Sequence, residues 1–405
     1  MNLHSKIFVS VVLIFVLAAL GMLIHRTFNP QPQGSPLYDG ISGSSLEDYY
    51  NRSQQNLQDQ NTQVTFNAVG DIMLSRDVAG KMYSNQKDAY WPFRNLENEL
   101  RWDADFNFAN LESPFSDSNE YKFQNQFIFN APSWSLPGLI QYNFNVLNLA
   151  NNHILNQGIN GLTYTKKLLS DNNIKSLGVG ENLDEAWKGQ VFSIKGIRIG
   201  FIGATYAAIT PDGFIDAQHT ARIKDLDRLT QSLQELKTRS DFIVVTMHAG
   251  EEYTREPNYE QTGFAKAAID AGADLVIGAH PHWIQTIEQY KGKQIFYSLG
   301  NFVFDQMWSQ DTREGLMLKI TLTKPGFCHP GLSQNSPTPL SRSEQINLVC
   351  TTELQGTPKP ATLKQIELIP VIIEDYGQPR LATEQEKQKI LNKIGVTTTV
   401  IAPEN

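Results

Sequence analysis

From Val64 onward the chain alternates short apolar runs, rich in β-branched and aromatic residues, with longer stretches in which apolar residues recur every three or four positions. The short runs predict β-strands, and the longer stretches predict amphipathic helices. This alternation constrains the fold more than any other feature, because it favours helices packed in layers on a sheet. We therefore predict a fold of the α/β class.

The periodicity also gives approximate bounds for the elements. Around Lys195 and Gly196 two strand-like runs lie close together and indicate a hairpin, so the sheets should be mixed and not purely parallel. Strands are predicted at 64–69, 106–109, 145–149, 190–194, 197–202, 242–247, 275–277, 294–298 and 362–373. Helices are predicted at 161–170, 221–238, 261–271 and 383–394.

The N-terminal segment contains an uncharged apolar run from Ile7 to Ile24, which reaches the lower length limit of a membrane-spanning helix. A buried core helix is the alternative, but such a helix usually keeps a polar stripe. No clear Ala-x-Ala cleavage site follows, so we favour an uncleaved anchor over a signal peptide. Lys6 before the run and the acidic residues after it weakly favour an extracytoplasmic main domain of a single-pass cell-membrane protein.

Composition divides the chain into segments. The predicted segments are a membrane anchor at 1–26, an Asn-, Gln- and Ser-rich flexible linker at 27–62, the main domain at 63–323, a Pro/Ser/Thr-rich insertion at 324–360, and a strand and helix completing the domain at 361–405. The two cysteines, Cys328 and Cys350, both fall in the insertion. They could form a disulfide in an oxidising compartment or remain free thiols in the cytosol, and the sequence leaves both readings open.

Two classes of function are disfavoured. The net charge is −8 and no block of Lys or Arg exceeds two residues, so the basic footprint of a nucleic-acid-binding protein is missing. No G-x-x-x-x-G-K-[ST] loop occurs in the sequence, so the chain is not expected to be an ATP-dependent ligase.

Polar clusters directly follow five of the predicted strands, at the strand ends where α/β sheets present functional groups. Each cluster has an ordinary interpretation on its own: Gly-Asp is usually a turn, and Asn-Asn-His could be a helix cap. Together they supply imidazole, carboxylate and amide oxygen, a set that suits Zn²⁺, Mn²⁺ or Fe²⁺ better than Cu(I). The candidate residues are Asp71, Glu112, Asn152, His153, His248, His280 and His282.

At these clusters the sequence resembles a known family. The motifs GDIMLSR, ANLE, LANNHILNQG, HAGEEY, GAHPHWIQTIEQ and YSLGNFVFDQ, in this order from about Phe66 to Gln306, resemble the bacterial capsule-synthesis family CapA, which is linked to poly-γ-glutamate capsules. That family is related to the calcineurin-like metallophosphatases. The resemblance implies an α/β/β/α sandwich with mixed sheets, preceded here by the expected transmembrane helix.

The resemblance also implies roles for individual residues. Asp71 and His282 would hold one divalent ion, Asn152, His248 and His280 would hold a second, and Glu112 would bridge the two. His153 would act as an acid or orient the substrate. Mn, Zn, Fe or Mg could fill such a centre, where two ions acidify a shared water and offset charge on a phosphoryl or carbonyl oxygen. If two ions bind, Arg76 could act beside His153 as a catalytic residue that pairs with an anionic phosphate or carboxylate, or it could be an ordinary surface arginine.

Three positions depart from the family pattern. Met73 stands where the metallophosphatase motif Asp-x-His has histidine, and a thioether is a poor ligand for a hard ion. Asn156 stands where the CapA pattern usually has Asp, and Ala249 stands where it usually has Trp. The first metal position is therefore expected to be weak or empty.

Three functions fit these observations. The first is a membrane-anchored capsule-assembly component that acts on an anionic exopolymer such as poly-γ-glutamate, with membrane-bound synthase subunits as partners. The second is a free-standing metal-dependent phosphoesterase or a hydrolase of polymer or cell wall. The third is a polymer-binding module without catalysis. Metal content and metal-dependent turnover distinguish the enzyme from the module.

Overall fold

The computed structural model describes residues 61–96, 104–118, 127–325, 327–330, 348–351 and 360–403. All of them belong to one compact unit, Leu57–Asn405. The predicted membrane anchor and nearly all of the predicted linker lie outside the described residues. Among the residues that are described, no helix is long and apolar enough to cross a membrane.

The first sheet has nine strands and is centred on β1 (Thr62–Ile72). On one side of β1 follow three parallel strands, β2 (Phe106–Leu111), β3 (Phe144–Asn148) and β4 (Lys175–Leu177). On the other side, joined by antiparallel pairings, follow β12 (Glu314–Lys324), β15 (Thr362–Glu374) and β16 (Gln378–Leu381). The short strands β11 (Asn301–Val303) and β17 (Val400–Ile401) pair with β1 and β15.

The second sheet has six strands. In spatial order they are β5 (Gln190–Ile194), β6 (Ile197–Thr205), β7 (Phe242–His248), β8 (Leu275–Ala279), β10 (Lys293–Phe296) and β9 (Ile287–Tyr290). The four central strands are parallel and the two edge strands are antiparallel. The predicted hairpin joins β5 to β6, and its two turn residues, Lys195 and Gly196, both have the positive φ that such a turn requires.

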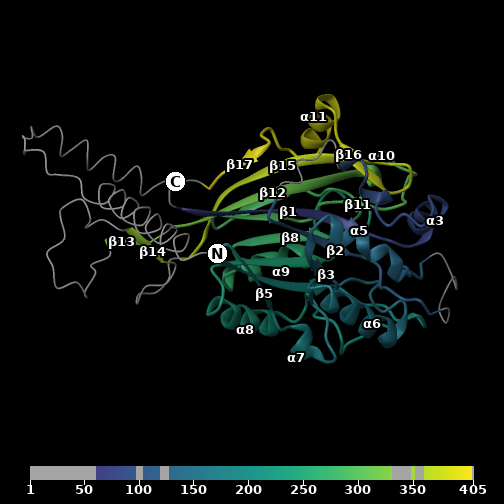
Figure 1. Cartoon of the computed structure of the whole chain (residues 1–405), viewed down its shortest axis with the longest axis horizontal. Coiled ribbons are helices and arrows are strands. Elements are labelled where there is room, and N and C mark those ends of the chain that lie inside the picture. Colours follow the sequence, from purple (N-terminus) through teal and green to yellow (C-terminus); the bar gives the residue numbers. More distant parts are fainter. Residues whose placement is uncertain are drawn as a thin grey trace, which may run out of the picture. The chain divides into compact units, whose positions relative to one another are not determined.

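Helices cover the outer faces of both sheets (Figure 1). Over the first sheet pack α3 (Arg76–Ser84), α5 (Leu136–Gln141) and α6 (Gly158–Asp171), and over the second pack α8 (Leu226–Lys237) and α9 (Tyr259–Asp270). The shorter elements are α7 (Leu183–Ala186), α10 (Gln310–Arg313), η1 (Trp91–Phe93) and η2 (Ser133–Ser135). Near the C-terminus, α11 (Glu384–Lys393) packs on β15. Between β12 and β15 in the sequence, β13 (Phe327–Pro330) pairs with β14 (Leu348–Thr351) as a separate two-stranded sheet.

The inner faces of the two sheets pack against each other. Phe66 and Phe108 of the first sheet meet Phe201 of the second, with ring centroids 6.3 and 6.0 Å apart, respectively. All three rings are fully buried, and each such ring contributes roughly 1.5–3 kcal/mol through its removal from water. Because helices lie outside both sheets, the layers are helix, sheet, sheet, helix, and the predicted α/β class with mixed sheets is confirmed.

The predicted helix at 221–238 is wrong in its first turn, since α8 begins only at Leu226. Ala221 and Arg222 instead extend the sheet: the Thr205 N–H donates to the Ala221 carbonyl at 2.9 Å, and Thr205 forms a parallel bridge with Arg222. This tertiary pairing overrides the local helical pattern.

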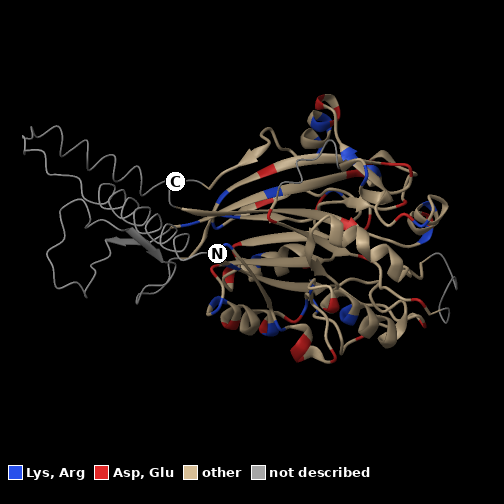
Figure 2. Ribbon diagram, viewed as in Figure 1, with Lys and Arg blue, Asp and Glu red and all other residues tan. Residues whose placement is uncertain are grey.

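Lys and Arg are interspersed with Asp and Glu along α8 and α11 (Figure 2). On these helices, basic and acidic side chains therefore share the exposed faces instead of forming a patch of one sign. This distribution gives them no basic stripe of the kind that binds nucleic acid.

Candidate metal centre

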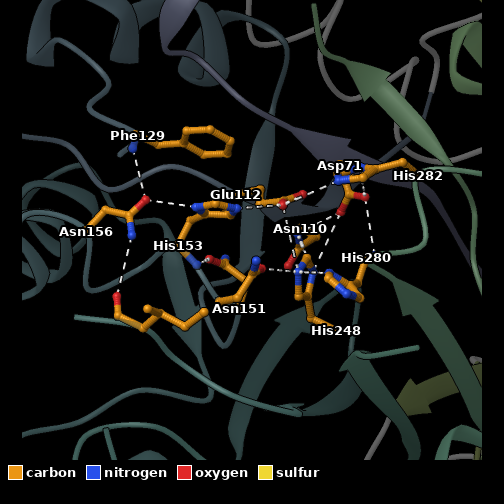
Figure 3. A network of polar contacts seen from close by, with 12 residues as sticks. Asp71, Asn110, Glu112, Phe129, Asn151, His153, Asn156, His248, His280 and His282 are labelled. Atoms are coloured by element: carbon orange, nitrogen blue, oxygen red, sulfur yellow. Dashed lines mark hydrogen bonds and ion pairs between the residues drawn. The ribbon is translucent and has the colours of Figure 1, made fainter. Parts of the chain in front are cut away.

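The carboxyl ends of strands from both sheets converge on one buried cluster of polar side chains (Figure 3). Asp71 lies at the end of β1, Glu112 follows β2, Asn152 and His153 follow β3, His248 ends β7, and His280 and His282 follow β8. The structure thus brings together the seven strand-end residues that the sequence singled out. All except His153 are at most 5% exposed.

A glycine allows the end of β1 to approach its neighbour closely. A Cβ atom added to Gly70 would lie 1.8 Å from the Gly300 carbonyl oxygen, so no other residue fits there without a shift of the backbone. The next residue, Asp71, donates its N–H to the same oxygen at 3.1 Å. This close approach fixes the backbone from which the Asp71 carboxylate projects.

Both histidines of the Gly-Ala-His-Pro-His segment have a strained backbone. The φ of His280 is 100° and that of His282 is 59°, in a region that favours glycine. Such strain typically costs about 1–3 kcal/mol per residue and persists where the surroundings enforce it, most often at functional sites. Here Pro281 accepts the Tyr253 N–H at 2.9 Å, which helps to hold the segment.

Glu112 lies at the centre of the cluster. Its Oε1 is 3.7 Å from His153 Nε2, 3.8 Å from His248 Nε2 and 4.0 Å from His282 Nε2. These separations are too long for hydrogen bonds, and they leave room for an ion about 2.0–2.2 Å from each of two such atoms. Both carboxylate oxygens are buried, and neither accepts a hydrogen bond from the described residues.

Three further atoms converge beside Glu112. Asn110 Nδ2 faces His248 Nδ1 at 3.1 Å, so His248 Nε2 carries the proton and donates to Asn152 Oδ1 at 2.7 Å; an ion bound here would replace that proton. His248 Nε2 is also 3.1 Å from His280 Nδ1. Ligand atoms of Glu112, His248 and His280 all lie within 4.8 Å of one another, so this group could hold one ion. The amide oxygen of Asn152 would add a fourth ligand.

A second group shares Glu112. Ligand atoms of Asp71, Glu112 and His282 also lie within 4.8 Å of one another. The Asn301 amide is oriented by the Thr312 carbonyl, which can only accept a hydrogen bond and takes one from Nδ2 at 2.9 Å. Asn301 Oδ1 therefore faces His282 Nδ1 at 2.9 Å and must accept its proton, which leaves the His282 Nε2 lone pair toward Glu112.

A chain of buried asparagines orients Asp71 in the same way. The Ala150 carbonyl fixes Asn148, whose Nδ2 donates to Asn110 Oδ1 at 2.8 Å. Asn110 Nδ2 must then face Asp71 Oδ1, also at 2.8 Å. The chain holds one carboxylate oxygen of Asp71 in a defined direction.

Burial dominates the electrostatics of the cluster. It raises the pKa of Glu112 well above the ordinary range, and the Asp71 and Glu252 carboxylates raise that pKa further. Burial and then the neighbouring imidazoles lower the pKa of His248 and of His280, and burial lowers the pKa of His153 to about 3. His248 and His280 therefore favour the neutral form that binds metal, and a cation beside Glu112 would stabilise its charged form.

Asn156 determines the orientation of His153. Its Oδ1 accepts the Phe129 N–H at 2.9 Å, so the same oxygen must also accept the His153 Nδ1 proton at 2.8 Å. The other ring nitrogen, Nε2, is directed toward Glu112 (Figure 3). Asn156 stands where the family pattern usually has Asp, and its side-chain amide still selects the nitrogen of the His153 ring that faces the cluster.

The other two departures lie in the core. Met73 is fully buried among apolar side chains, and its sulfur accepts the Ser75 N–H at 3.1 Å. Ala249 packs in the apolar cluster under α9. The Arg76 guanidinium, expected to pair with an anionic group or to lie on the surface, is paired with Asp305.

Several residues that shape the cluster were not predicted as site residues. Asn110 and Asn148 lie in strands, at positions where an apolar residue is the usual choice, and that anomaly could have pointed to them. Asn301 lies in a motif that carried the resemblance, but nothing in the sequence pairs it with His282. The contact of Asp305 with Arg76 spans most of the domain and leaves no local signal.

The layers and the cluster define a protein of the α/β/β/α class, with a buried imidazole and carboxylate centre of the kind that holds divalent ions. The family described as bacterial capsule synthesis protein PGA_cap matches residues 65–306. The PGA biosynthesis protein CapA of Bacillus subtilis (strain 168) is 36% identical over 64% of this chain and 67% of its own length. The capsule biosynthesis protein CapA of Bacillus anthracis is 31% identical over 75% of each chain. The chain belongs to this capsule synthesis family.

Solved structures resemble the chain more distantly. A phosphatase from Mycoplasma pneumoniae covers 66% of this chain and 89% of its own at 14% identity, with a TM-score of 0.39. A 5′-nucleotidase precursor from Thermus thermophilus covers 82% of this chain and 57% of its own at 13% identity, with a TM-score of 0.33. Likeness at this level does not bear on substrate or mechanism.

Proposed function

We propose that the protein is a metal-dependent hydrolase that acts on a cell-surface polymer during capsule synthesis. The observation that carries the proposal is Glu112, a fully buried carboxylate that accepts no hydrogen bond from the described residues and has three imidazoles at 3.7–4.0 Å. A buried carboxylate without compensation costs several kcal/mol. A divalent ion on each side of Glu112 would supply that compensation.

Asp71, His282 and Glu112 would hold one ion, and Asn152, His248, His280 and Glu112 would hold the other. Such ions supply a nucleophile at neutral pH and polarise a phosphoryl or carbonyl oxygen. His153 would orient the reacting group, because Asn156 holds its ring with Nε2 toward Glu112. The buried surroundings of these side chains would strengthen each charge interaction.

The polymer is the least constrained part of the proposal. The relatives are named for capsule and PGA biosynthesis, which supports an anionic exopolymer such as poly-γ-glutamate. The apolar run from Ile7 to Ile24 supports anchoring to the cell membrane, and the charges around it weakly favour the domain outside. Membrane-bound synthase subunits would be the partners of such a domain.

A second candidate function is a polymer-binding module without catalysis. The buried thioether of Met73 favours it, because no imidazole is supplied from that position to the first ion. Such a module would bind polymer and leave it intact.

The test is turnover by the purified protein, with and without chelator, on poly-γ-glutamate and on phosphodiester substrates. We expect cleavage of one of these bonds that stops with chelator and returns when Mn²⁺ or Zn²⁺ is added. Binding of polymer without turnover, in protein that carries metal, would favour the module and contradict the hydrolase.

A further inference from the structure

The Arg76 guanidinium contacts a pair of phenyl rings, Phe129 and Phe304, which themselves pack edge to face with centroids 6.2 Å apart and planes at 71°. The guanidinium carbon is 4.8 Å from the centroid of Phe129 and 5.5 Å from the centroid of Phe304. Both rings are at most 2% exposed. Contacts of this kind contribute about 0.5–2 kcal/mol each, and more when they are desolvated.

Each phenyl ring in turn contacts one imidazole of the candidate metal centre. Phe129 stacks on His153, with centroids 3.8 Å apart and ring planes at 17°. Phe304 packs at a tilt on His282, with centroids 4.7 Å apart. A single guanidinium therefore contacts both rings of a packed phenyl pair, and each ring contacts one of two histidines that reach the cluster from different sheets.

Asp305 holds the guanidinium in place. Its Oδ2 accepts from Arg76 Nε at 3.1 Å, and its Oδ1 accepts from Nη2, so the pair is bidentate. Asp305 Oδ2 also accepts the Asp77 N–H at 3.1 Å, which ties the carboxylate to the first turn of α3. Asp305 is only 6% exposed, and Arg76 keeps a left-handed backbone with φ 47° at the start of the helix.

We propose that Arg76 is a positioning residue and not an anchor for substrate. Arg76, Asp305, Phe129 and Phe304 form an arginine clamp that, together with the hydrogen bonds to Asn156 and Asn301, fixes the ring planes of His153 and His282. The inference rests on the proposed metal centre, because it concerns how the ligand His282 is presented to an ion.

Charge and positioning predict opposite effects on metal affinity. The positive charge of Arg76 lies only one phenyl ring away from each of the two imidazoles. By charge alone, a cation this close repels a divalent ion, so its removal should tighten metal binding. If the clamp positions His282, its removal should weaken metal binding. A pure substrate anchor could be removed without loss of metal affinity.

The experiment is titration calorimetry of Mn²⁺ into the full-length metal-free protein, with circular dichroism as a check of folding. We expect Arg76→Met to weaken binding about 10- to 100-fold, the effect typical of a lost outer-shell partner. Arg76→Lys should not restore affinity, because an ammonium group cannot form the bidentate and stacked contacts. Lys81→Met is the matched control, since Lys81 lies on the same helix and pairs with Asp375.

Unchanged or tighter Mn²⁺ binding by Arg76→Met would overturn the clamp. If Arg76→Met does not fold, Asp305→Asn carries the test, with the same loss expected. Where both variants fold, the double variant should lose little more than either single variant, because the two residues act as one unit. Fully additive losses would contradict the clamp, whereas failure of the wild-type protein to bind Mn²⁺ would contradict the proposed metal centre itself.

Discussion

At the scale of single residues, fixed hydrogen-bond acceptors decide what the cluster can do. The Thr312 and Ala150 carbonyls can only accept, so each fixes the orientation of an asparagine amide. The Thr312 carbonyl, acting through Asn301, selects the His282 nitrogen that faces Glu112. The Ala150 carbonyl, acting through Asn148 and Asn110, directs one oxygen of Asp71. The ligands are thus oriented by atoms that lie outside any recognisable motif.

His282→Ala and Asn152→Ala test one ligand of each ion. We expect each to lower the affinity for one ion at least 100-fold, because a lost ligand costs more than the 10- to 100-fold typical of a lost outer-shell partner. Unfolding by denaturant should show a loss of at most about 1–3 kcal/mol, from partners left unpaired. His219→Ala is the control, since His219 pairs with Asp216 and is not one of the seven clustered residues. Full metal occupancy in both variants would refute the ligand assignment.

Met73→His tests the departure from the metallophosphatase pattern. We expect tighter binding of the first ion, because imidazole replaces a poor ligand. The metal-free protein should lose about 1–3 kcal/mol of stability, because a polar ring enters a buried apolar position. Calorimetric titration and denaturant unfolding measure the two effects. Unchanged affinity would mean that the side chain at this position stays in the core.

At the scale of elements, the strand ends were the most predictable part of the molecule. The apolar runs that end at Asp71, His248 and His280 predicted both a strand and a functional group beyond it, and each strand is present. The helix pattern misplaced the start of α8, because Ala221 and Arg222 pair with Thr205 across the fold. The spacing of apolar residues along the sequence predicts local structure, but it does not predict pairing between residues that are far apart in the chain.

The helix α11 gives a prediction about pH. Hydrogen bonding to Arg380 lowers the pKa of the Glu386 carboxyl group to about 2. The ionised carboxylate therefore stabilises the folded state fully at pH values above its ordinary pKa near 4.5, and this stabilisation is lost as the pH falls through about 2. Glu386→Gln keeps the capping box but should cost about 0.5–1 kcal/mol at pH 7, a small value because solvent still reaches the ion pair, whose side chains are 23% and 31% exposed.

Urea denaturation of this variant and of the wild-type protein from pH 7 to pH 3 measures the difference in unfolding free energy. The difference should narrow below about pH 4.5. Glu384→Gln, on the same turn but 88% exposed, should show almost no difference at any pH. If the difference in unfolding free energy between Glu386→Gln and the wild-type protein stays constant over this pH range, the assigned interaction of Glu386 with Arg380 is contradicted.

The ribbon of β13 and β14 gives a prediction about the cysteines. The backbone register places Cys328 directly opposite Cys350. Opposed residues of antiparallel strands have Cα atoms about 4.5–5.5 Å apart, within the range of disulfides. We expect peptide mass spectrometry of protein secreted into an oxidising medium to find the two cysteines linked. Alkylation of both cysteines without prior reduction would contradict this.

At the scale of the whole molecule, the alternation of strands and helices was enough to predict the α/β class and mixed sheets. It could not predict that the strand ends of two separate sheets meet, because that depends on how Phe66 and Phe108 pack on Phe201. The grouping of Asp71 and His282 apart from His248 and His280 came from the family resemblance. Nothing in the sequence indicated that Asp305 would hold Arg76 beside Phe129 and Phe304.

The most direct test of the account is the metal content of the purified protein by plasma mass spectrometry, measured before and after chelation. We predict about one to two divalent ions per chain, because the position beside Met73 is expected to bind weakly. The thermal unfolding midpoint should fall on chelation, since a ligand at 100 times its Kd stabilises the folded state by about 2.7 kcal/mol. Protein without bound ions, with the same midpoint in Mn²⁺, in Zn²⁺ and in chelator, would contradict the metal centre around Glu112.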